Sequence, residues 1–350
     1  CGILCAGCGT GKTTMSIYSI CHMKRKTIIL LHKEFLLQQW KERLSEYAPG
    51  LRVGVIQQSC VQIDDYDVVL AMIQTVISDY KQDISYDSFE LCVIDECHHL
   101  CCRTFIKSMR KMSCPRIGLT ATLERQDGLS YSIMNEVGDV VCDIKRNVHC
   151  EVDVFDYATN DPKCTNCSIP YATLTNNICD DDSRNNMIAD IVHGVFHEDS
   201  RRIILVISSR KSLLRTIHDK LLEKGIDKED IGYYMGCVTK KQKEERALSE
   251  DKRIILGTSG VCSEGLDIKK MNTVLLATPC KQITQITGRI MRGGSEVTPR
   301  IIDISDKYNY IFSSMSAHRF KQYKKEKYTI RVHTSFVIGK FFKKNSTIKQ

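Results

Sequence analysis

The chain has 350 residues and a formal net charge of +8, with 42% hydrophobic and 26% charged residues. This length suits two domains with separate cores, and the composition is that of a soluble globular protein. No apolar run approaches the ~20 residues of a membrane span and no signal peptide is visible, so we expect no membrane partner and an intracellular protein, in the cytoplasm or nucleus. The mild positive charge favours a polyanionic partner. The first residue is Cys rather than Met, which suggests that upstream sequence is missing.

The first motif in the chain is a candidate phosphate-binding loop, AGCGTGKTT, at residues 6–14. Glycines let successive backbone N–H groups face one anion. We expect Lys12 to reach the outer phosphates and the Thr13 hydroxyl to take one position on Mg²⁺. The residues expected to bind the nucleotide here are Gly7, Gly9, Thr10, Gly11, Lys12, Thr13 and Thr14.

The flanking sequence supports this interpretation of the loop. The apolar run at residues 2–5 predicts a strand, and residues 12–23 predict a helix with Ile17 and Ile20 available for burial. Strand, loop and helix in this order are the setting that the motif needs, which argues against a small-residue loop that matches by chance. The loop alone indicates only a phosphate binder, because GTPases, kinases and motors share it.

The rest of the first half alternates between short apolar runs and amphipathic segments. Strands are predicted at residues 27–31, 68–71, 91–94 and 116–119, and a helix at residues 34–47. That helix places Leu36, Leu37, Trp40 and Leu44 on one side. Apolar strands separated by helices are typical of a parallel sheet covered on both faces, so we predict a first α/β domain over residues 1–148.

Two carboxylates follow one of these buried strands, in the run LCVIDECHH at residues 91–99. Ligands bind at the carboxyl ends of the strands in open α/β sheets. We expect Asp95 to hold Mg²⁺, and Glu96 to act as the base that polarises the water attacking the γ-phosphate. An exposed acidic pair is the alternative, and the phosphate loop in the same domain argues against it.

A pair of hydroxyls follows the strand at residues 116–119. Thr120 and Thr122, in the run GLTAT, lie where they can join the acidic pair to whatever is bound on the opposite surface. A run of this kind is a weak signal by itself.

The alternation stops between residues 149 and 182, where we expect a linker or insertion. This interval holds Cys164, Cys167 and Cys179, with His149 and Cys150 just upstream. A zinc site needs two ligand pairs at suitable separation, and only one regular pair is present, so we prefer an irregular insertion to a Zn²⁺ site at Cys164 and Cys167. The eighteen cysteines of the chain are otherwise expected to be reduced thiols, many of them buried.

A second alternation predicts another α/β domain over residues 183–330. Its strands are expected at residues 202–207, 253–256, 273–277 and 300–303, and its helices at residues 210–224, 239–249 and about 281–291. The remaining segment, residues 331–350, is basic and is expected to be a tail that either follows a phosphate backbone or stays solvated and partly disordered.

The last predicted helix of the second domain carries three polar residues on one face. Gln285, Arg289 and Arg292 are spaced at i, i+4 and i+7. Guanidinium groups suit the charge that develops on a transferring phosphoryl group. A helix with two arginines is usually a solvated face, but Gly288 and the apolar neighbours favour an interface here.

With these pieces together, the sequence resembles the superfamily 2 helicases. It is most similar to the branch that holds the translocase subunit of the general transcription and DNA-repair factor and the helicases of large cytoplasmic DNA viruses. In chain order, motifs I, Ia, Ib, II, III, IV, V and VI are resembled by AGCGTGKT, LLHKEFLLQQWKERL, VLAMIQTV, VIDECHH, GLTAT, ILVISSR, ILGTSGVCSEGLDI and QITGRIMR. The resemblance covers roughly residues 1–330 and implies an α/β fold of two tandem RecA-like domains, each a mainly parallel sheet covered by helices.

Two further stretches narrow the branch. Residues 123–128 resemble its Arg-Glu-Asp element, with Gln126 where the family often has Glu, and residues 232–236 resemble a turn of the viral members. The family's upstream adenine-reading element is absent from this chain, so base selectivity is not assigned. Motif II reads Asp-Glu-Cys-His, which does not settle DNA against RNA.

The resemblance also implies roles for individual residues. Gln285, Arg289 and Arg292 close the site from the second domain, Gly265 and Asp267 lie near the nucleotide, and Thr120 and Thr122 couple hydrolysis to strand movement. Contacts to nucleic-acid phosphates, which carry no sequence preference, are implied at His32, Lys33, Gln74, Thr75, Ser208, Arg210, Thr258 and Ser259.

We therefore expect an ATP- and Mg²⁺-dependent DNA helicase or translocase, in which hydrolysis between the two domains drives stepping along or unwinding of DNA. The alternatives are an RNA helicase, a regulatory nucleic-acid-binding subunit that has lost hydrolysis, and a P-loop GTPase or kinase. Intact Lys12, Glu96, Arg289 and Arg292 argue against lost hydrolysis, and the arginine helix argues against a GTPase or kinase. Expected partners are nucleic acid and the transcription or replication machinery, in the host cytoplasm or virion if the chain is viral; the oligomeric state stays open.

Overall fold

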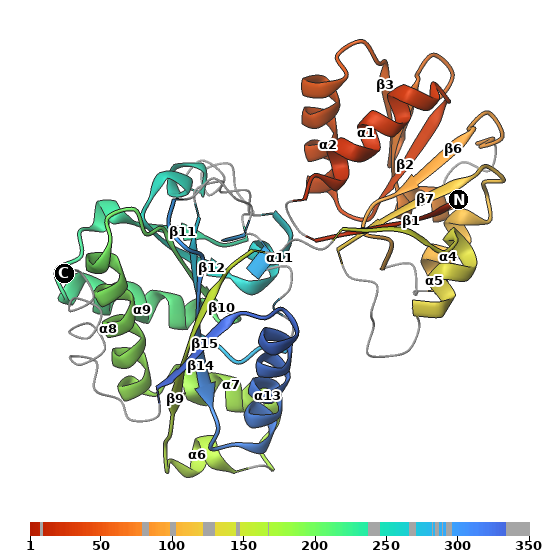
Figure 1. Cartoon of the computed structure of the whole chain (residues 1–350). Helices are drawn as coiled ribbons and strands as arrows, with labels where there is room; N and C mark the ends of the chain where they lie inside the picture. The colour runs from red at the N-terminus through yellow and green to blue at the C-terminus, as the bar shows by residue number, and fades with distance from the viewer. Residues whose placement is uncertain are drawn as a thin grey trace. The chain divides into compact units, whose positions relative to one another are not determined.

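The structure is a computed structural model in which the chain forms two compact units, Cys1–Asn147 and Val148–Gln350, each built on its own sheet (Figure 1). The residues that it describes are 1–7, 10–78, 84–98, 103–121, 130–144, 148–166, 168–236, 246–265, 271–281, 283, 287–288, 290–291 and 296–333.

The first unit contains an eight-stranded sheet with the order β4-β3-β5-β2-β6-β7-β1-β8. Neighbouring strands are parallel except for β3 and β4, which form an antiparallel pair. The strands are β1 (Gly2–Ala6), β2 (Thr27–Leu31), β3 (Val53–Gln57), β4 (Cys60–Val61), β5 (Val68–Met72), β6 (Leu91–Ile94), β7 (Arg116–Thr120) and β8 (Val140–Ile144). The helices are α1 (Lys12–Met23), α2 (Glu34–Tyr47), α3 (Ile73–Ile77), α4 (Arg103–Met109) and α5 (Ser130–Val137).

Both faces of this sheet are covered, because its central strands β2 and β6 are buried at every position. In β2, Ile28 and Leu30 belong to the hydrophobic cluster that includes residues of α4 and α5. Ile29 and Leu31 point the other way, into the cluster that includes residues of α1 and α2. Figure 1 shows these two helix pairs on opposite sides of the sheet. Burial of each such side chain contributes roughly 1.5–3 kcal/mol, so this core stabilises the central strands.

The second unit contains a seven-stranded parallel sheet with the order β11-β12-β10-β13-β14-β9-β15. Its strands are β9 (Glu151–Tyr157), β10 (Ile204–Ser208), β11 (Ile231–Tyr234), β12 (Ile254–Thr258), β13 (Thr273–Leu276), β14 (Arg300–Asp306) and β15 (Thr329–His333). Its helices are α6 (Pro162–Thr165), α7 (Tyr171–Cys179), α8 (Asp182–Glu198), α9 (Lys211–Glu223), α11 (Ser259–Gly265) and α13 (Tyr310–Lys325), with short 3-10 turns η2 (Lys228–Asp230) and η3 (Ser249–Asp251).

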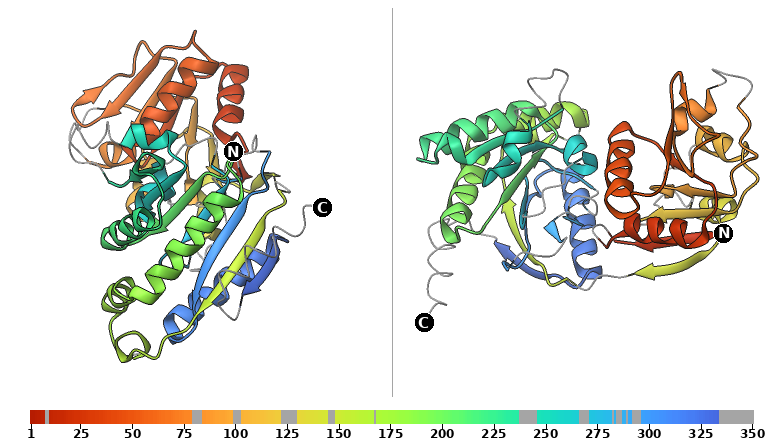
Figure 2. Two further views of the ribbon diagram at one scale, coloured as in Figure 1. Left: turned by 90° about the vertical axis from the view of Figure 1, so that its left-hand side faces the viewer. Right: turned by 90° about the horizontal axis from the view of Figure 1, so that it is seen from above.

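The second sheet is also covered on both faces. Ile204 and Val206 of β10 pack in the cluster that contains the apolar side chains of α8 and α9. Leu205 of the same strand packs in the opposite cluster, with Cys262 of α11 and Tyr323 of α13. Figure 2 shows α8 and α9 running together along one side of this sheet. The two mainly parallel, helix-covered sheets confirm the predicted fold class.

The interval 149–182, expected to be a linker or insertion, begins with a strand of the second sheet. β9 pairs along its whole length with β14 and also pairs with β15. Because Glu151 and Asp153 are charged, the sequence pattern did not predict a buried strand here. Asp153 is nevertheless only 1% exposed, and its carboxylate pairs with Arg331 and His333 of β15. The rest of the interval contains α6, α7 and the start of α8.

Three smaller expectations differ from the structure in whole or in part. Residues 232–236, expected to be a turn, lie largely in β11, and Gly232 is required there because a Cβ would approach the Cβ of Ser249 to 2.6 Å. The helix expected at residues 239–249 is helical at 246–248 in its described part. The segment expected to be a tail begins within β15, and residues 334–350 lie outside the described part of the chain. No helix within the described ranges is long and apolar enough to cross a membrane.

Candidate nucleotide-binding site

The carboxyl edge of the first sheet brings the predicted nucleotide residues together. β7 lies between β1 and β6, so the phosphate loop after β1, Thr120 at the end of β7 and the carboxylates after β6 follow one another along the edge. The strand registers agree, since Cys5 pairs with Thr120 and Ile94 pairs with Gly118. Residues far apart in the sequence therefore share one site, at the edge where ligands of α/β sheets bind.

The phosphate loop turns into α1 through a glycine in the left-handed region. Gly11, the N-cap residue, has φ 85° and ψ 27°, a conformation that strongly favours glycine. Thr10 closes the turn, with its N–H and its hydroxyl both donating to the carbonyl of Gly7 at 3.3 and 2.6 Å. Its N-cap glycine has no side chain to cap α1, and no acidic residue lies in the first turn of the helix. The first N–H groups of the helix therefore remain available for an anion, which the helix dipole also favours.

Lys12 lies folded back over this loop. Its Nζ donates a hydrogen bond of 2.9 Å to the carbonyl of Ala6, the last residue of β1. Thr13 is half-buried beside it and Thr14 is exposed. The ammonium group is therefore held at the mouth of the phosphate loop, where a bound phosphate would compete with the Ala6 carbonyl for it.

Asp95 is buried, at 8% exposure, and both of its oxygens accept hydrogen bonds from neutral groups. Trp40 Nε1 donates to Oδ2 at 2.9 Å, and the backbone N–H of Glu96 donates to Oδ1 at 3.0 Å. Burial and then the charge of Glu96 raise the pKa of Asp95 to about 6, although the Trp40 hydrogen bond and the charge of Lys12 oppose this rise. The site is thus short of positive charge, which a divalent cation bound through oxygen ligands would supply. The residues present fit Mg²⁺ held by Asp95 and Thr13.

Glu96 and Thr120 are linked through a histidine. Glu96 has a positive φ of 49°, which turns its side chain away from the line of β6. Nδ1 of His98 lies 3.2 Å from Oε2 of Glu96 and 3.1 Å from the hydroxyl of Thr120. We did not assign a role to His98 from the sequence, although its place two residues after the expected base was a usable signal.

Further along the same edge lie the residues of the first unit that were expected to contact nucleic acid. β2 leads to His32 and Lys33, and its neighbour β5 leads to Gln74 and Thr75 in α3. The exposed Gln74 donates from Nε2 to the carbonyl of His32 at 2.8 Å, so the two segments contact each other directly. The hydroxyl of Thr75 accepts a bond of 3.0 Å from the N–H of Gln58.

In the second unit, the residues that were expected to contact nucleic acid also lie close together. Two of them, Ser208 and Arg210, form hydrogen bonds within the unit. Ser208 of β10 pairs in register with Thr258 of β12, and Ser259 follows as the first residue of α11. Ser208 is fully buried, and its hydroxyl donates to the carbonyl of Arg210 at 3.0 Å and accepts from the N–H of Arg210 at 2.9 Å.

Arg210 itself docks on α7, with Nε donating to Asn176 at 2.6 Å and the guanidinium also donating to the carbonyl of Ala172 at 3.2 Å. The local turn therefore uses the hydroxyl of Ser208, and the expected contact of Ser208 and Arg210 with nucleic acid stays a prediction. Arg210 contributes to the position of α7, a contact that lies too far apart in the chain to be seen in the sequence.

Several predicted residues lie outside the part of the chain that the structure describes. They are Gly9, Thr122, Cys167, Asp267, Gln285, Arg289 and Arg292. Gly265 is the last residue of α11. Their roles remain predictions.

The possible zinc site also remains a prediction. Cys164 is buried in the core of the second unit, where burial raises the pKa of its thiol to about 11. Among the residues whose positions are described, no group of three or more His, Cys, Asp or Glu side chains is arranged to hold a metal ion.

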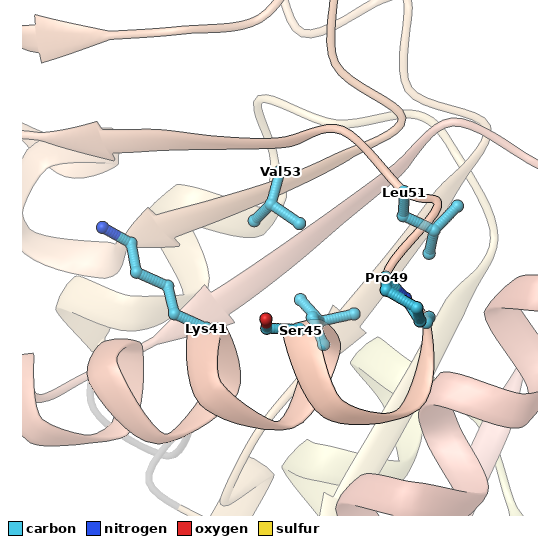
Figure 3. Close-up of a pocket in the computed structure, with 7 residues that line it drawn as sticks. Lys41, Ser45, Pro49, Leu51 and Val53 are labelled. Atoms are coloured by element: carbon cyan, nitrogen blue, oxygen red, sulfur yellow. The ribbon is translucent and has the colours of Figure 1, made fainter.

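A shallow pocket of about 230 Å³ lies where α2 ends and the chain enters β3 (Figure 3). It is lined by Lys41, Leu44, Ser45, Ala48, Pro49, Leu51 and Val53. None of the predicted site residues contributes to it, so we assign it no part in nucleotide binding.

Comparison with known families and structures identifies the relatives of the two units. Residues 2–125 match the family described as type III restriction enzyme, res subunit, and residues 183–295 match the helicase conserved C-terminal domain. Among solved structures, S. cerevisiae Dbp5 bound to RNA and ADP BeF3 has a similar fold, with a TM-score of 0.65 and 12% identity over 99% of this chain and 88% of that one.

Two viral proteins are similar over most of the chain. One from Acanthamoeba polyphaga mimivirus, named as an ATP-dependent RNA helicase, is 30% identical over 94% of this chain and 65% of its own length. One from African swine fever virus, named in the same way, is 27% identical over 92% of this chain and 68% of its own length. The chain thus spans about two thirds of the length of these relatives.

Proposed function

Because the chain belongs to the superfamily 2 helicases and is related to helicases of large DNA viruses, we propose that it is an ATP-dependent nucleic-acid helicase or translocase. One observation carries the proposal. A phosphate loop with an uncapped helix, a buried carboxylate and a second carboxylate meet at one sheet edge, next to strands whose loops suit a polyanion.

In this function the first unit binds the nucleotide. The N–H groups of α1 and the ammonium of Lys12 would hold the phosphates, and Asp95 and Thr13 would hold Mg²⁺. When bound, Mg²⁺ neutralises the charge that develops on the phosphates. Glu96 accepts the proton of the attacking water, and His98 orients its carboxylate. As the family resemblance implies, we assign Gln285, Arg289 and Arg292, with Gly265 and Asp267, to the same nucleotide site.

Coupling to nucleic acid follows the same sheet edge in our proposal. His98 contacts both Glu96 and Thr120, so a change at the γ-phosphate reaches the end of β7. The edge continues to the loops after β2 and β5, and we propose that Lys33 and Gln74 in these loops contact phosphates. Contacts of this kind are sensitive to salt and carry no base preference.

For the polymer we propose DNA first, because the motifs resemble the transcription and repair branch. RNA is the second candidate, favoured by the names of the two viral relatives. Since these relatives are viral, we propose that the chain acts inside an infected cell, alongside transcription or replication machinery.

The test is ATP hydrolysis by the whole chain alone and with single-stranded DNA, duplex DNA or RNA of one sequence. We expect Mg²⁺-dependent hydrolysis that single-stranded DNA stimulates more than RNA. Lys12→Ala should abolish it, while Lys41→Ala, a matched lysine outside the site, should not. Stimulation by RNA alone would make the RNA helicase correct, and nucleic-acid binding without any hydrolysis would identify a regulatory subunit.

A further inference from the structure

The expected metal carboxylate has a neighbour from a different part of the fold. Trp40 lies on α2, is 1% exposed, and donates from Nε1 to Oδ2 of Asp95 over 2.9 Å, although 55 positions separate the two residues in the chain. Trp40 is the single tryptophan of the sequence. A buried carboxylate with a buried N–H donor of this kind is held in one orientation, because rotating it would leave the indole N–H unsatisfied.

The indole is itself fixed by packing. Trp40 belongs to the hydrophobic cluster between α1, α2 and the first sheet, flanked along its own helix by Leu37 and Leu44, which are 4% and 0% exposed. These contacts leave the ring little freedom. The second oxygen of Asp95 is bound by the N–H of Glu96, so each oxygen has one protein donor and keeps a lone pair directed elsewhere.

We infer that Trp40 is a positioning residue for metal binding, whose indole N–H orients the Asp95 carboxylate toward the cation at the phosphate loop. This inference rests on the proposed function, since it concerns the Mg²⁺ that accompanies ATP. Groups that hydrogen-bond a metal ligand from behind orient it, and their loss typically weakens metal affinity about 10–100-fold.

The position of Trp40 on α2 adds a second consequence. α2 begins directly after His32 and Lys33, with Lys33 as its N-cap residue. Through Trp40, α2 is therefore hydrogen-bonded to Asp95, the expected metal ligand. The same helix begins at the expected nucleic-acid contact. A shift of α2 on nucleic-acid binding would act on Asp95 through this hydrogen bond.

The first experiment is a Mg²⁺ titration of ATP hydrolysis by the whole chain with Trp40→Phe, which keeps an aromatic ring and removes the N–H. We expect the Mg²⁺ concentration for half-maximal rate to rise about tenfold, with much of the maximal rate recovered at high Mg²⁺. Leu213→Ala is the control, since it removes a buried apolar side chain from a hydrophobic cluster of the second unit, to which Trp40 does not belong. A Mg²⁺ dependence in Trp40→Phe equal to that of the control overturns the inference and leaves the proposed function standing.

The second experiment needs no activity and uses the unaltered chain. Because Trp40 is the single tryptophan, its fluorescence reports on Asp95 directly. We expect ADP with Mg²⁺ to change the emission and ADP with EDTA to leave it nearly unchanged, while Asp95→Asn removes the metal-dependent change. If ADP binds and the tryptophan emission is the same with and without Mg²⁺, the inference is also overturned. A chain that shows the metal-dependent emission but hydrolyses no ATP supports the inference and contradicts the proposed function.

Discussion

The carboxylates of the two units are used in opposite ways. In the first unit, buried Asp95 accepts hydrogen bonds from the neutral N–H groups of Trp40 and Glu96. In the second unit, buried Asp303 and Asp306 each form bidentate pairs with a buried arginine, Arg319 and Arg184 respectively. A carboxylate neutralised by a guanidinium has little need of another cation, whereas Asp95 keeps a charge that a ligand can compensate.

The pKa values follow this contrast. Burial raises the pKa of Asp95 to about 6. Burial acts in the same direction on Asp153 of the second unit, but the hydrogen bond to His333 and the charges of Arg300 and Arg331 lower the pKa of Asp153 below its ordinary value. A buried carboxylate that is not paired with a cationic side chain indicates a functional site. A buried carboxylate that is surrounded by arginines indicates a structural role.

The largest expected effect is a loss of ATP turnover, without a loss of stability, when the expected base of the first unit is replaced. Glu96→Gln should lower the ATP turnover rate roughly 10²–10⁴-fold, because a general base contributes about that much. Its thermal midpoint should stay near that of the unaltered chain. Phosphate release measures the rate, with Glu42→Gln, an acid on the exposed side of α2, as the control. Turnover that survives in Glu96→Gln would mean that another group is the base.

The next effect tests the architectural role of the second unit. Arg319→Leu leaves Asp303 buried without its partner, so the free energy of unfolding should fall by roughly 3–5 kcal/mol. Denaturant unfolding measures this change. The double variant Arg319→Leu, Asp303→Leu should recover much of the loss, because no isolated charge remains. A single variant as stable as the unaltered chain would show that Asp303 already has another source of compensation.

A smaller effect should have the opposite sign in the first unit. The folded-state pKa of Asp95 is raised, so ionisation of this group opposes folding above about pH 6 and this cost disappears as the pH falls below that value. Asp95→Asn should therefore stabilise the nucleotide-free chain by roughly 1–2 kcal/mol at pH 8, with a smaller gain at pH 5. Thermal unfolding at the two pH values provides the measurement. A destabilised variant at pH 8 would show that Asp95 is compensated in the folded chain.

The smallest effect compares the expected nucleic-acid contacts of the two units. Lys33→Ala should weaken nucleic-acid binding and lower the slope of log affinity against log salt by about 1, as for loss of one phosphate contact. Arg210→Ala should leave this slope nearly unchanged, because its guanidinium already binds α7. Fluorescence anisotropy at several salt concentrations measures both slopes. Equal slopes for the two variants would show that Arg210 leaves α7 when nucleic acid binds.

Much of the fold was predictable because local patterns are strong in this chain. The predicted bounds of α1, β2, α2 and β6 agree with the structure residue for residue. These elements have continuous apolar runs or a clear helical stripe. β9 was missed because acidic residues recur along it, and β15 was missed because Arg331 and His333 fall in the segment expected to be a basic tail. The ion pairs between the two strands form only when they meet in the sheet.

In the candidate site, too, some features could be predicted from the sequence and others could not. The sequence alone determined which groups exist for the chemistry, since the phosphate loop and the Asp95–Glu96 pair are contiguous motifs whose residue types are chosen by short-range geometry. Only the tertiary structure decided how they are held, through Trp40 against Asp95, His98 between Glu96 and Thr120, and Arg210 on α7. Most of these contacts join separate strands and helices, and they depend on the order in which the strands lie side by side in the sheet. Spacing along a chain carries no record of that order.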